Sequence, residues 1–382
     1  MTVFYEPVKE KNREKMQKTN PVKGLLEKGV SEGIFPGAVL IAALGGEVIL
    51  FEEAGYSSLK PHKNMMSRDT IFDLASLTKP LATTLGVMKL VDNGDILPDQ
   101  RIWSILKENI PEDKRNITPR LLLCHCSGLP HWIPLYSRVI QYPPAIRKKM
   151  ARRIIMESSL VAMPGEKVIY SDPGFIILEW IIEKITGMSM DSFVDQHFYG
   201  PLSLGNTFFC NIENSCLFEE DRFAATEYCE WRGRIIRGVV HDENAYALGG
   251  YSGHAGLFGT AEDMYYIVEM LRNHFYNRSS DFFRPETVAE FFTRQNISEG
   301  STWALGWDTP SEENSSAGKY FSRNSIGHLG FTGTSIWMDL EKDVIVIFLT
   351  NRVHPTRANE KIKLFRPVIH DRIMEYIGAS FK

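Results

Sequence analysis

The hydrophobic pattern near the start of the chain predicts a β-hairpin. Residues 38–43 form a short apolar run, and residues 47–51 form a second one. Gly45 and Gly46 lie between them, and glycine tolerates the positive φ angles of a tight turn. Before this hairpin, residues 22–30 carry apolar side chains at helical spacing and predict an amphipathic helix.

A second hairpin is predicted near the other end of the chain. Residues 335–340 and 344–350 flank the polar turn at 341–343. The second of these strands is almost entirely apolar, so we expect it to be buried on both faces. A helical segment at 359–377 follows, which Pro367 is expected to kink or interrupt.

Between these ends the pattern is mainly helical. The best helix candidates are residues 81–91, 151–156 and 175–185, with loops rich in proline and glycine between them. Strands at both ends and helices in the middle predict an α+β protein with an inserted, mainly helical domain. We place the first domain at 1–75 and 235–382 and the helical domain at 76–234, with a ligand site between them.

Composition narrows the function classes. The 382 residues are 43% hydrophobic and 24% charged, which are ordinary values for a globular protein. A formal net charge of −4 gives no basic field, so nucleic acid is not an expected partner. No run of eighteen apolar residues and no apolar signal-peptide core is present, so we expect neither a membrane span nor a leader.

Cysteine usage points to a reducing compartment. An odd and sparse set of thiols in a chain of this length does not imply a disulfide framework. We therefore expect a cytosolic protein, with an exported protein whose leader has been removed as the alternative. The thiols are Cys124, Cys126, Cys210, Cys216 and Cys229.

The segment IFDLASLTKPLATT carries the most informative pair of residues. Ser76 and Lys79 are three residues apart where an apolar helix begins, which places both side chains on one face. A serine hydroxyl needs a neighbouring base to become a nucleophile, and a lysine can serve if burial lowers its pKa. A structural alternative is that Ser76 caps the helix that has Pro80 in its first turn.

Several ordered segments together resemble one family, the serine hydrolases of the class C β-lactamase and penicillin-recognising type, which includes related esterases and D-amino-acid-specific peptidases. The resemblance spans residues 30 to 350. It implies a β-lactamase/transpeptidase-like fold, in which an antiparallel sheet is flanked by the N- and C-terminal helices. The segments are PGAVLIAALGGEVILFEEAGY (36–56), DLASLTKP (73–80), LLLCHCSGLP (121–130), PGEKVIYSDPGFIILEWIIEKITG (164–187), GGYSGHAGLFGTAEDM (249–264) and GHLGFTGTS (327–335).

The resemblance implies roles for three side chains. Ser76 would be the nucleophile, and Lys79 would take or relay its proton. Tyr170 occupies the position of the family tyrosine that acts with the lysine as general acid and base. A phenol normally titrates near 10, so this role needs a cationic neighbour, which Lys79 could be. The structural alternative for Tyr170 is a loop tyrosine that anchors the following helix.

Asp172 departs from the family pattern, which usually has asparagine at this position. Just before Pro173, Gly174 and an apolar helix, it is well placed as a helix N-cap. If it instead faces the site, its charge could pair with Lys79 and would disfavour an anionic substrate group. Both roles stay open, so we include Asp172 among the candidate substrate-binding residues.

His328 and Gly330 match the family's Lys-Thr-Gly position in its His-x-Gly form, and both are candidate substrate-binding residues. The resemblance implies that the backbone amides of Phe331 and Ser76 form the oxyanion hole. A histidine is largely neutral near pH 7, so it binds a carboxylate less firmly than lysine would. This substitution favours neutral esters or amides.

The loop at residues 124–126 and the residue His254 are both interpreted as structural. Cys124, His125 and Cys126, with His131 nearby, could suggest a metal, but the family's corresponding loop binds none, so we expect no metal and no cofactor. His254 is interpreted as a loop histidine satisfied by the backbone, with a place in the wall of the site as the alternative.

The sequence therefore predicts a serine hydrolase acting through an acyl-enzyme on Ser76. An esterase or amidase of small ester, amide or β-lactam-like substrates is preferred. The alternatives are a β-lactamase or a D-Ala-D-Ala carboxypeptidase of the penicillin-binding type, and, from another class, a non-catalytic ligand-binding protein on the same scaffold. The sequence gives no indication of the oligomeric state.

Overall fold

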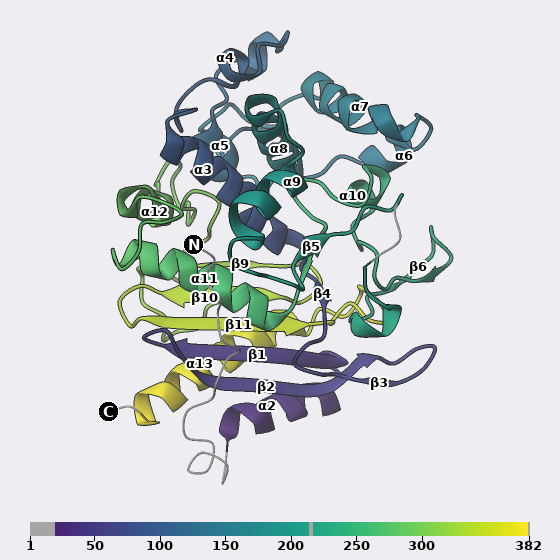
Figure 1. Ribbon diagram of the computed structural model, residues 1–382, viewed down its shortest axis with the longest axis vertical. Coiled ribbons are helices and arrows are strands. Elements are labelled where there is room, and N and C mark those ends of the chain that lie inside the picture. Colours follow the sequence, from purple (N-terminus) through teal and green to yellow (C-terminus); the bar gives the residue numbers. More distant parts are fainter. Residues whose placement is uncertain (1–19, 214–216, 381–382) are drawn as a thin grey trace.

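The computed structural model describes residues 20–213 and 217–380. Within them, both predicted hairpins belong to one six-stranded antiparallel sheet with the order β3-β2-β1-β11-β10-β9 (Figure 1). The first and last long strands of the chain are neighbours, with Ile41 opposite Ile347. Cys216 and the residues before Asn20 lie outside the described residues.

The strands are of very different lengths. The long ones form the central sheet, and the short ones form a three-stranded sheet (β4-β8-β5) and a small hairpin (β6-β7). Their bounds are β1 Gly37–Leu44, β2 Glu47–Ser58, β3 Asn64–Met65, β4 Phe72–Asp73, β5 Phe208–Phe209, β6 Tyr228–Cys229, β7 Arg234–Ile235, β8 Leu257–Gly259, β9 Ser325–Leu329, β10 Ser335–Asp339 and β11 Val344–Thr350.

The helical elements comprise α-helices of different lengths and short 3-10 or π-helical turns. The α-helices are α2 Pro21–Ser31, α3 Leu85–Asn93, α4 Ile102–Leu106, α5 Pro119–Leu123, α6 Leu135–Val139, α7 Pro144–Glu157, α8 Asp172–Thr186, α9 Met190–Val194, α10 Glu243–Ala247, α11 Ala261–Phe275, α12 Pro285–Phe292 and α13 Ile362–Ser380. The other helical turns are η1 Ala75–Leu77, η2 Lys79–Thr84, η3 Glu112–Lys114, η4 Asp195–Tyr199 and η5 Glu220–Arg222. Within the described residues, no helix combines the length and the apolar character that crossing a bilayer requires.

Both faces of the central sheet are buried, as the apolar strand at 344–350 predicts. On β11, Val346 and Phe348 pack in the hydrophobic cluster shared with α2 and α13. Ile345, Ile347 and Leu349 belong to the cluster on the other face, where α11 lies (Figure 1). The expected α+β fold, with terminal helices flanking an antiparallel sheet, is confirmed.

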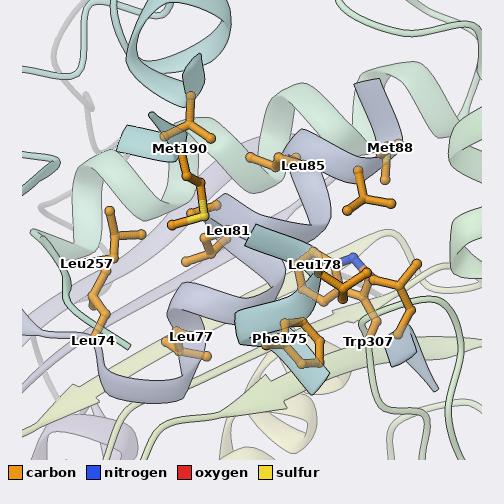
Figure 2. Close-up of a cluster of buried hydrophobic side chains, with 14 of the residues drawn as sticks. Leu74, Leu77, Leu81, Leu85, Met88, Phe175, Leu178, Met190, Leu257 and Trp307 are labelled. Atoms are coloured by element: carbon orange, nitrogen blue, oxygen red, sulfur yellow. The ribbon is translucent and has the colours of Figure 1, made fainter. Parts of the chain in front are cut away.

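A second part of the same core surrounds the helix that carries Ser76 and Lys79. Leu77, Leu81 and Leu85 point into a cluster with Phe175 and Leu178 from α8 (Figure 2). The predicted helix at 81–91 consists of a π-helical turn (η2) that continues into α3 and ends at Gly94, whose φ is 81°. π-Helical turns are often found at functional sites.

The helix bounds differ from the predictions in two places. Pro367 lies inside α13, which continues past it to Ser380 without a break. The buried side chains of Phe365 and Ile369 on either side of Pro367 pack against the sheet and hold the helix together. The predicted helix at 151–156 is only the last part of α7, whose first two turns are more polar. The division into domains at 1–75, 76–234 and 235–382 stays a prediction.

We predict that Ile347→Ala lowers the free energy of unfolding by about 2–5 kcal/mol, because it opens a cavity in the fully buried centre of β11. Val368→Ala removes methyl groups from a half-exposed position on α13 and serves as the control, with an expected change below about 0.5 kcal/mol. Urea unfolding of both variants and the wild type measures these changes. Equal effects of the two substitutions would contradict this account of the core.

Candidate active site

The chain makes a constrained turn directly before Ser76. Ala75 has a φ of 48°, in the left-handed region that non-glycine residues rarely adopt. The buried carboxylate of Asp73 accepts hydrogen bonds from the backbone N–H of Ala75 (2.9 Å) and of His241 (2.6 Å). The carbonyl oxygen of Asp73 accepts another from the Thr332 hydroxyl (2.8 Å). Asp73 therefore joins three segments at the turn that presents Ser76.

Lys79 is completely buried and its ammonium group has three oxygen partners. Nζ lies 3.1 Å from Ser76 Oγ, 2.7 Å from Asp172 Oδ1 and 3.3 Å from the carbonyl oxygen of His254. Burial alone would lower the pKa of Lys79, but Asp172 and Tyr170 outweigh it and raise the pKa above its ordinary value. The expectation that burial lowers this pKa is therefore wrong, because the ion pair with Asp172, one of the two roles considered for that residue, outweighs burial.

Tyr170 lies beside this pair. Lys79 Nζ is 4.7 Å from the centre of its ring, and the side chains of Lys79 and Ser76 both act to lower the pKa of its phenol. Burial, together with the negative charge of Asp172, raises the pKa of Tyr170 despite the opposing effect of Lys79. Near neutral pH the site therefore contains an ammonium group and a neutral phenol.

The backbone around Tyr170 is fixed by two histidines. The ring of His125 stacks on the Tyr170 ring with 4.4 Å between centroids, and His125 Nδ1 accepts the N–H of Ser171 (2.9 Å). His131 Nδ1 lies 2.6 Å from the carbonyl oxygen of Tyr170. These contacts hold Tyr170 and Ser171 in place directly before α8.

Asp172 is not the helix cap. Ser171 caps α8 by accepting the N–H of Gly174 (3.3 Å), and Asp172 is the first helical residue. The cap prediction is therefore wrong by one residue, because Ser171 offers an equally suitable oxygen in the extended conformation that a cap needs. The carboxylate of Asp172 is left to pair with Lys79, the other role considered for it.

His328 lies on β9 in a buried position. Its ring centroid is 6.2 Å from that of Tyr170, and its Nδ1 is 2.9 Å from the carbonyl oxygen of Leu329. Burial, with a contribution from the charge of Lys79, lowers the pKa of His328 to about 3. His328 is therefore neutral at physiological pH, which agrees with the expectation for this position.

The turn after His328 packs closely against the segment that precedes Ser76. A Cβ atom at Gly330 would collide with the Thr334 hydroxyl and lie 2.6 Å from the Leu74 carbonyl oxygen. The Thr334 hydroxyl donates to that same carbonyl (3.2 Å). From α13, the buried Arg366 donates to the carbonyls of Gly330 and Thr334, both at 3.0 Å. Only glycine fits at position 330 without moving this turn.

Phe331, whose amide is a candidate oxyanion donor, has a half-exposed side chain held between two groups. Its ring stacks on His241 (5.6 Å between centroids), and the Arg352 guanidinium lies 4.6 Å from the ring centre. Arg352 also donates to the carbonyl oxygen of Phe331 (2.9 Å). The backbone on both sides of the Phe331 amide is therefore fixed.

Glu179, which was not among the predicted site residues, positions the carbonyl of His254. Glu179 is buried on α8 and accepts hydrogen bonds from Ser252 Oγ (2.7 Å) and the Gly253 N–H (2.9 Å). Lys148 neutralises it at 2.6 Å. A carboxylate within the otherwise apolar run of α8 was the available signal, because a buried charge requires partners.

The side chain of His254 pairs with Asp242, with 2.9 Å between Nε2 and Oδ1. Burial opposes the charged form of His254, but Asp242 outweighs it and raises the pKa of the imidazole. His254 is thus held by a carboxylate as well as contributing its backbone carbonyl to Lys79. Asp73 and Glu179 were not among the predicted site residues at all.

The cysteines and histidine considered for a metal have other partners. Cys124 and Cys126 are buried thiols whose sulfur atoms lie near the carbonyls of Ala304 and Cys124, respectively. Among the described residues, one group of possible metal ligands occurs, formed by Glu227, Cys229 and Glu243. Arg357 donates hydrogen bonds to both carboxylates of this group, so it already supplies the positive charge there.

Comparison with known proteins places the chain in a family. The β-lactamase family matches residues 22–366. The N-acetylmuramyl-L-alanine amidase of Bacillus subtilis is 31% identical over 366 residues, covering 88% of this chain and 82% of the relative. A putative D-alanyl-D-alanine carboxypeptidase of Salmonella paratyphi B is 31% identical over 374 residues, covering 91% and 85%.

Solved structures support the same fold. EstCE1, described as a hydrolase with promiscuous acyltransferase activity, has a TM-score of 0.70 at 23% identity and covers 92% of this chain and 97% of its own. A penicillin-binding protein homologue from Pyrococcus abyssi has a TM-score of 0.66 at 22% identity, covering 90% and 76%. The chain belongs to the β-lactamase family, and it is a serine hydrolase.

We predict that Gly330→Ala slows the reaction of the protein with a fluorophosphonate about 100-fold or more, because the added methyl displaces the turn that carries the Phe331 amide. Intact-mass spectrometry over time measures this rate. Gly24→Ala is the control, since a Cβ atom there meets nothing within 4 Å. An unchanged rate in Gly330→Ala would show that this close packing is unimportant for acylation.

Proposed function

We propose that the protein is an amidase that cleaves its substrate through an acyl-enzyme on Ser76. The observation that carries this proposal is the placement of Lys79 Nζ between Ser76 Oγ and the Asp172 carboxylate, with the Tyr170 phenol beside both. A non-catalytic binding protein has no need for a nucleophile, a buried cation and a phenol in this arrangement.

The reaction begins when the Lys79–Tyr170 unit has lost one proton. In that form the Tyr170 phenolate is held by the Lys79 ammonium, and it accepts the proton of Ser76 as Oγ attacks the substrate carbonyl carbon. The negative charge on the carbonyl oxygen is stabilised by the backbone amides of Ser76 and Phe331. When the C–N bond breaks, Tyr170 returns the proton to the departing amine nitrogen.

Hydrolysis of the acyl-enzyme uses the same groups. Tyr170, again a phenolate, accepts a proton from water while the water oxygen attacks the ester carbon. The bond to Ser76 Oγ then breaks, and Tyr170 gives the proton back to the serine. The proposed steps use only side chains and backbone amides of the protein, together with water.

The charges near Ser76 favour a substrate that is neutral at the scissile bond. His328 is neutral and Asp172 is negative. Arg357, whose guanidinium lies 5.9 Å from the centre of the Phe331 ring, is already engaged by Glu227 and Glu243. A carboxylate directly beside the scissile bond, as in D-alanyl-D-alanine or a β-lactam, would lack a free cation in this group. An amide that joins an N-acetylmuramyl group to L-alanine, the bond named by the Bacillus subtilis relative, has a neutral acyl side and fits better.

Esterase activity is a second candidate, favoured by the same observation. Small neutral esters require no cation near His328, and they react with an activated serine more readily than amides do. We therefore expect an ester such as p-nitrophenyl acetate to serve as a reporter of acylation. For location, the buried free thiols of Cys124, Cys126 and Cys229 support the cytosol as our proposal.

We predict that Ser76→Ala abolishes the mass adduct formed with a fluorophosphonate or with the ester reporter, because no nucleophile remains. Lys79→Ala and Tyr170→Phe are expected to slow adduct formation about 10²–10⁴-fold, the usual contribution of a general acid–base group. Intact-mass analysis of all four proteins provides the measurement. A wild-type protein that forms no adduct would favour the non-catalytic alternative.

We predict that kcat/KM for the ester reporter rises with pH through the neutral range, about tenfold per pH unit, because the ammonium–phenol unit must first lose a proton. Asp172 raises the pKa of both Lys79 and Tyr170, so Asp172→Asn should move the rising limb to lower pH. Asp95→Asn, at an exposed position after α3, is the matched control. A limb that stays in place in Asp172→Asn would refute this assignment.

A further inference from the structure

Four aromatic side chains form a partly exposed surface outside the catalytic group. They come from the loop before α6, from α6, from the turn between β6 and β7 and from α10, and we refer to them as the aromatic surface. Successive ring centroids are 6.4, 5.1 and 5.7 Å apart. The residues, in order of contact, are Trp132, Tyr136, Trp231 and Tyr246.

The outer members of this surface are accessible. The two indole side chains, Trp132 and Trp231, are 42% and 45% exposed, whereas the two tyrosines are partly buried beside them. Large apolar rings exposed together on a folded protein commonly mark a binding site.

The segments that carry the rings are fastened to one another. Asn244 on α10 accepts the N–H of Tyr136 (2.8 Å) and donates to the carbonyl of Ile133 (2.9 Å), which joins α6 to α10 (Figure 1). Arg232 lies 4.7 Å from the Tyr246 ring and donates to the carbonyl of Val240 (2.7 Å). The aromatic surface is therefore formed before any ligand binds, which lowers the entropy cost of binding.

One edge of the aromatic surface leads to Tyr170. His131, the residue before Trp132, contacts the carbonyl oxygen of Tyr170 through Nδ1 at 2.6 Å. Consecutive Cα atoms are about 3.8 Å apart, so Trp132 begins close to the backbone of this candidate catalytic residue.

The opposite edge leads to Ser76. Arg232, which follows Trp231, donates to the carbonyl of His241. The N–H of His241 is held by Asp73, three residues before Ser76, and its ring stacks on Phe331. Because hydrogen bonds tie the aromatic surface to the segments that carry Tyr170 and Ser76, it is suited to hold another part of a molecule whose carbonyl reaches Ser76.

The chemistry of the aromatic surface indicates which group this is. Arg232 is the cation that lies among the rings. Its guanidinium donates hydrogen bonds to the main-chain carbonyls of Val240 and His241, so it is engaged within the protein. What the rings offer is apolar faces, together with the hydroxyls of Tyr136 and Tyr246. A pyranose ring matches this combination, because its C–H face packs on aromatic rings while its hydroxyls reach polar neighbours.

We propose that the aromatic surface binds the sugar ring on the acyl side of the scissile amide. This proposal rests on the proposed amidase function, in which the acyl group is an N-acetylmuramyl group. It makes Trp231 and Tyr136 specificity-determining residues that hold the glycan while Ser76 attacks the carbonyl attached to it.

The first test measures binding by isothermal titration calorimetry in the Ser76→Ala background, which prevents turnover. The probes are N-acetylmuramyl-L-alanyl-D-isoglutamine and the same dipeptide without the sugar. The sugar-bearing probe should bind at least about tenfold more tightly, and Trp231→Ala or Tyr136→Ala should each remove about tenfold of that affinity. Trp103→Ala, an exposed tryptophan on α4, is the matched control and should change nothing.

Two outcomes overturn the proposal. Equal affinity for the two probes would show that the sugar has no subsite, and an equal weakening of both probes by Trp231→Ala would assign the aromatic surface to the peptide. Circular dichroism of each variant identifies a folding defect. If an alanine variant is misfolded, the milder Trp231→Phe and Tyr136→Phe variants replace it. These variants should lose little affinity for the sugar-bearing probe, and a tenfold loss would contradict ring stacking.

Turnover separates this proposal from the proposed function. In the Ser76-containing protein, Trp231→Ala should raise KM for the sugar-bearing probe by a larger factor than it changes KM for p-nitrophenyl acetate. If the sugar-bearing probe binds through the aromatic surface but is never cleaved, the amidase function fails and the subsite stands. If it is cleaved with an unchanged KM in Trp231→Ala, the subsite fails and the amidase function stands.

Discussion

The buried ammonium group of Lys79 sets the strictest requirement in this structure. A charge that is removed from water needs close partners, and each partner of Nζ comes from a different segment. Ser76 comes from the turn after β4, Asp172 from the first turn of α8, and the carbonyl of His254 from a glycine-rich loop. These segments must therefore assemble together, and Glu179 on α8 holds the loop that supplies the carbonyl.

The sheet provides the frame in which this can happen. Because β11 is apolar on both faces, it lies in the centre of the sheet and fixes β10 and β9 on one side of it. The turn after β9 then packs on the backbone before Ser76, where Asp73 and Leu74 accept its threonine hydroxyls. The Asp73 carboxylate also accepts hydrogen bonds from the N–H groups of Ala75 and His241, so it connects the turn before Ser76 with the segment that stacks on Phe331.

Local patterns were sufficient for part of this picture. Both hairpins follow from apolar runs around polar turns, and the proximity of Ser76 and Lys79 follows from their spacing on a helix. The protonation state of Lys79 did not follow, because it depends on Asp172, 93 positions away. The N-cap of α8 was predicted one residue too late, because Ser171 and Asp172 both have side chains that are suitable for an N-cap. Pro367 breaks a helix in isolation, but packing of its neighbours on the sheet overrides that preference.

The bonds from Arg366 to the carbonyls of Gly330 and Thr334 tie the turn beside Ser76 to the last helix of the fold. During translation, the ribosome must therefore synthesise the chain beyond position 366 before this turn gains its support. The strand that pairs with β1 also emerges late. A nascent chain released before this helix is made would carry the serine and the lysine without the frame that aligns them.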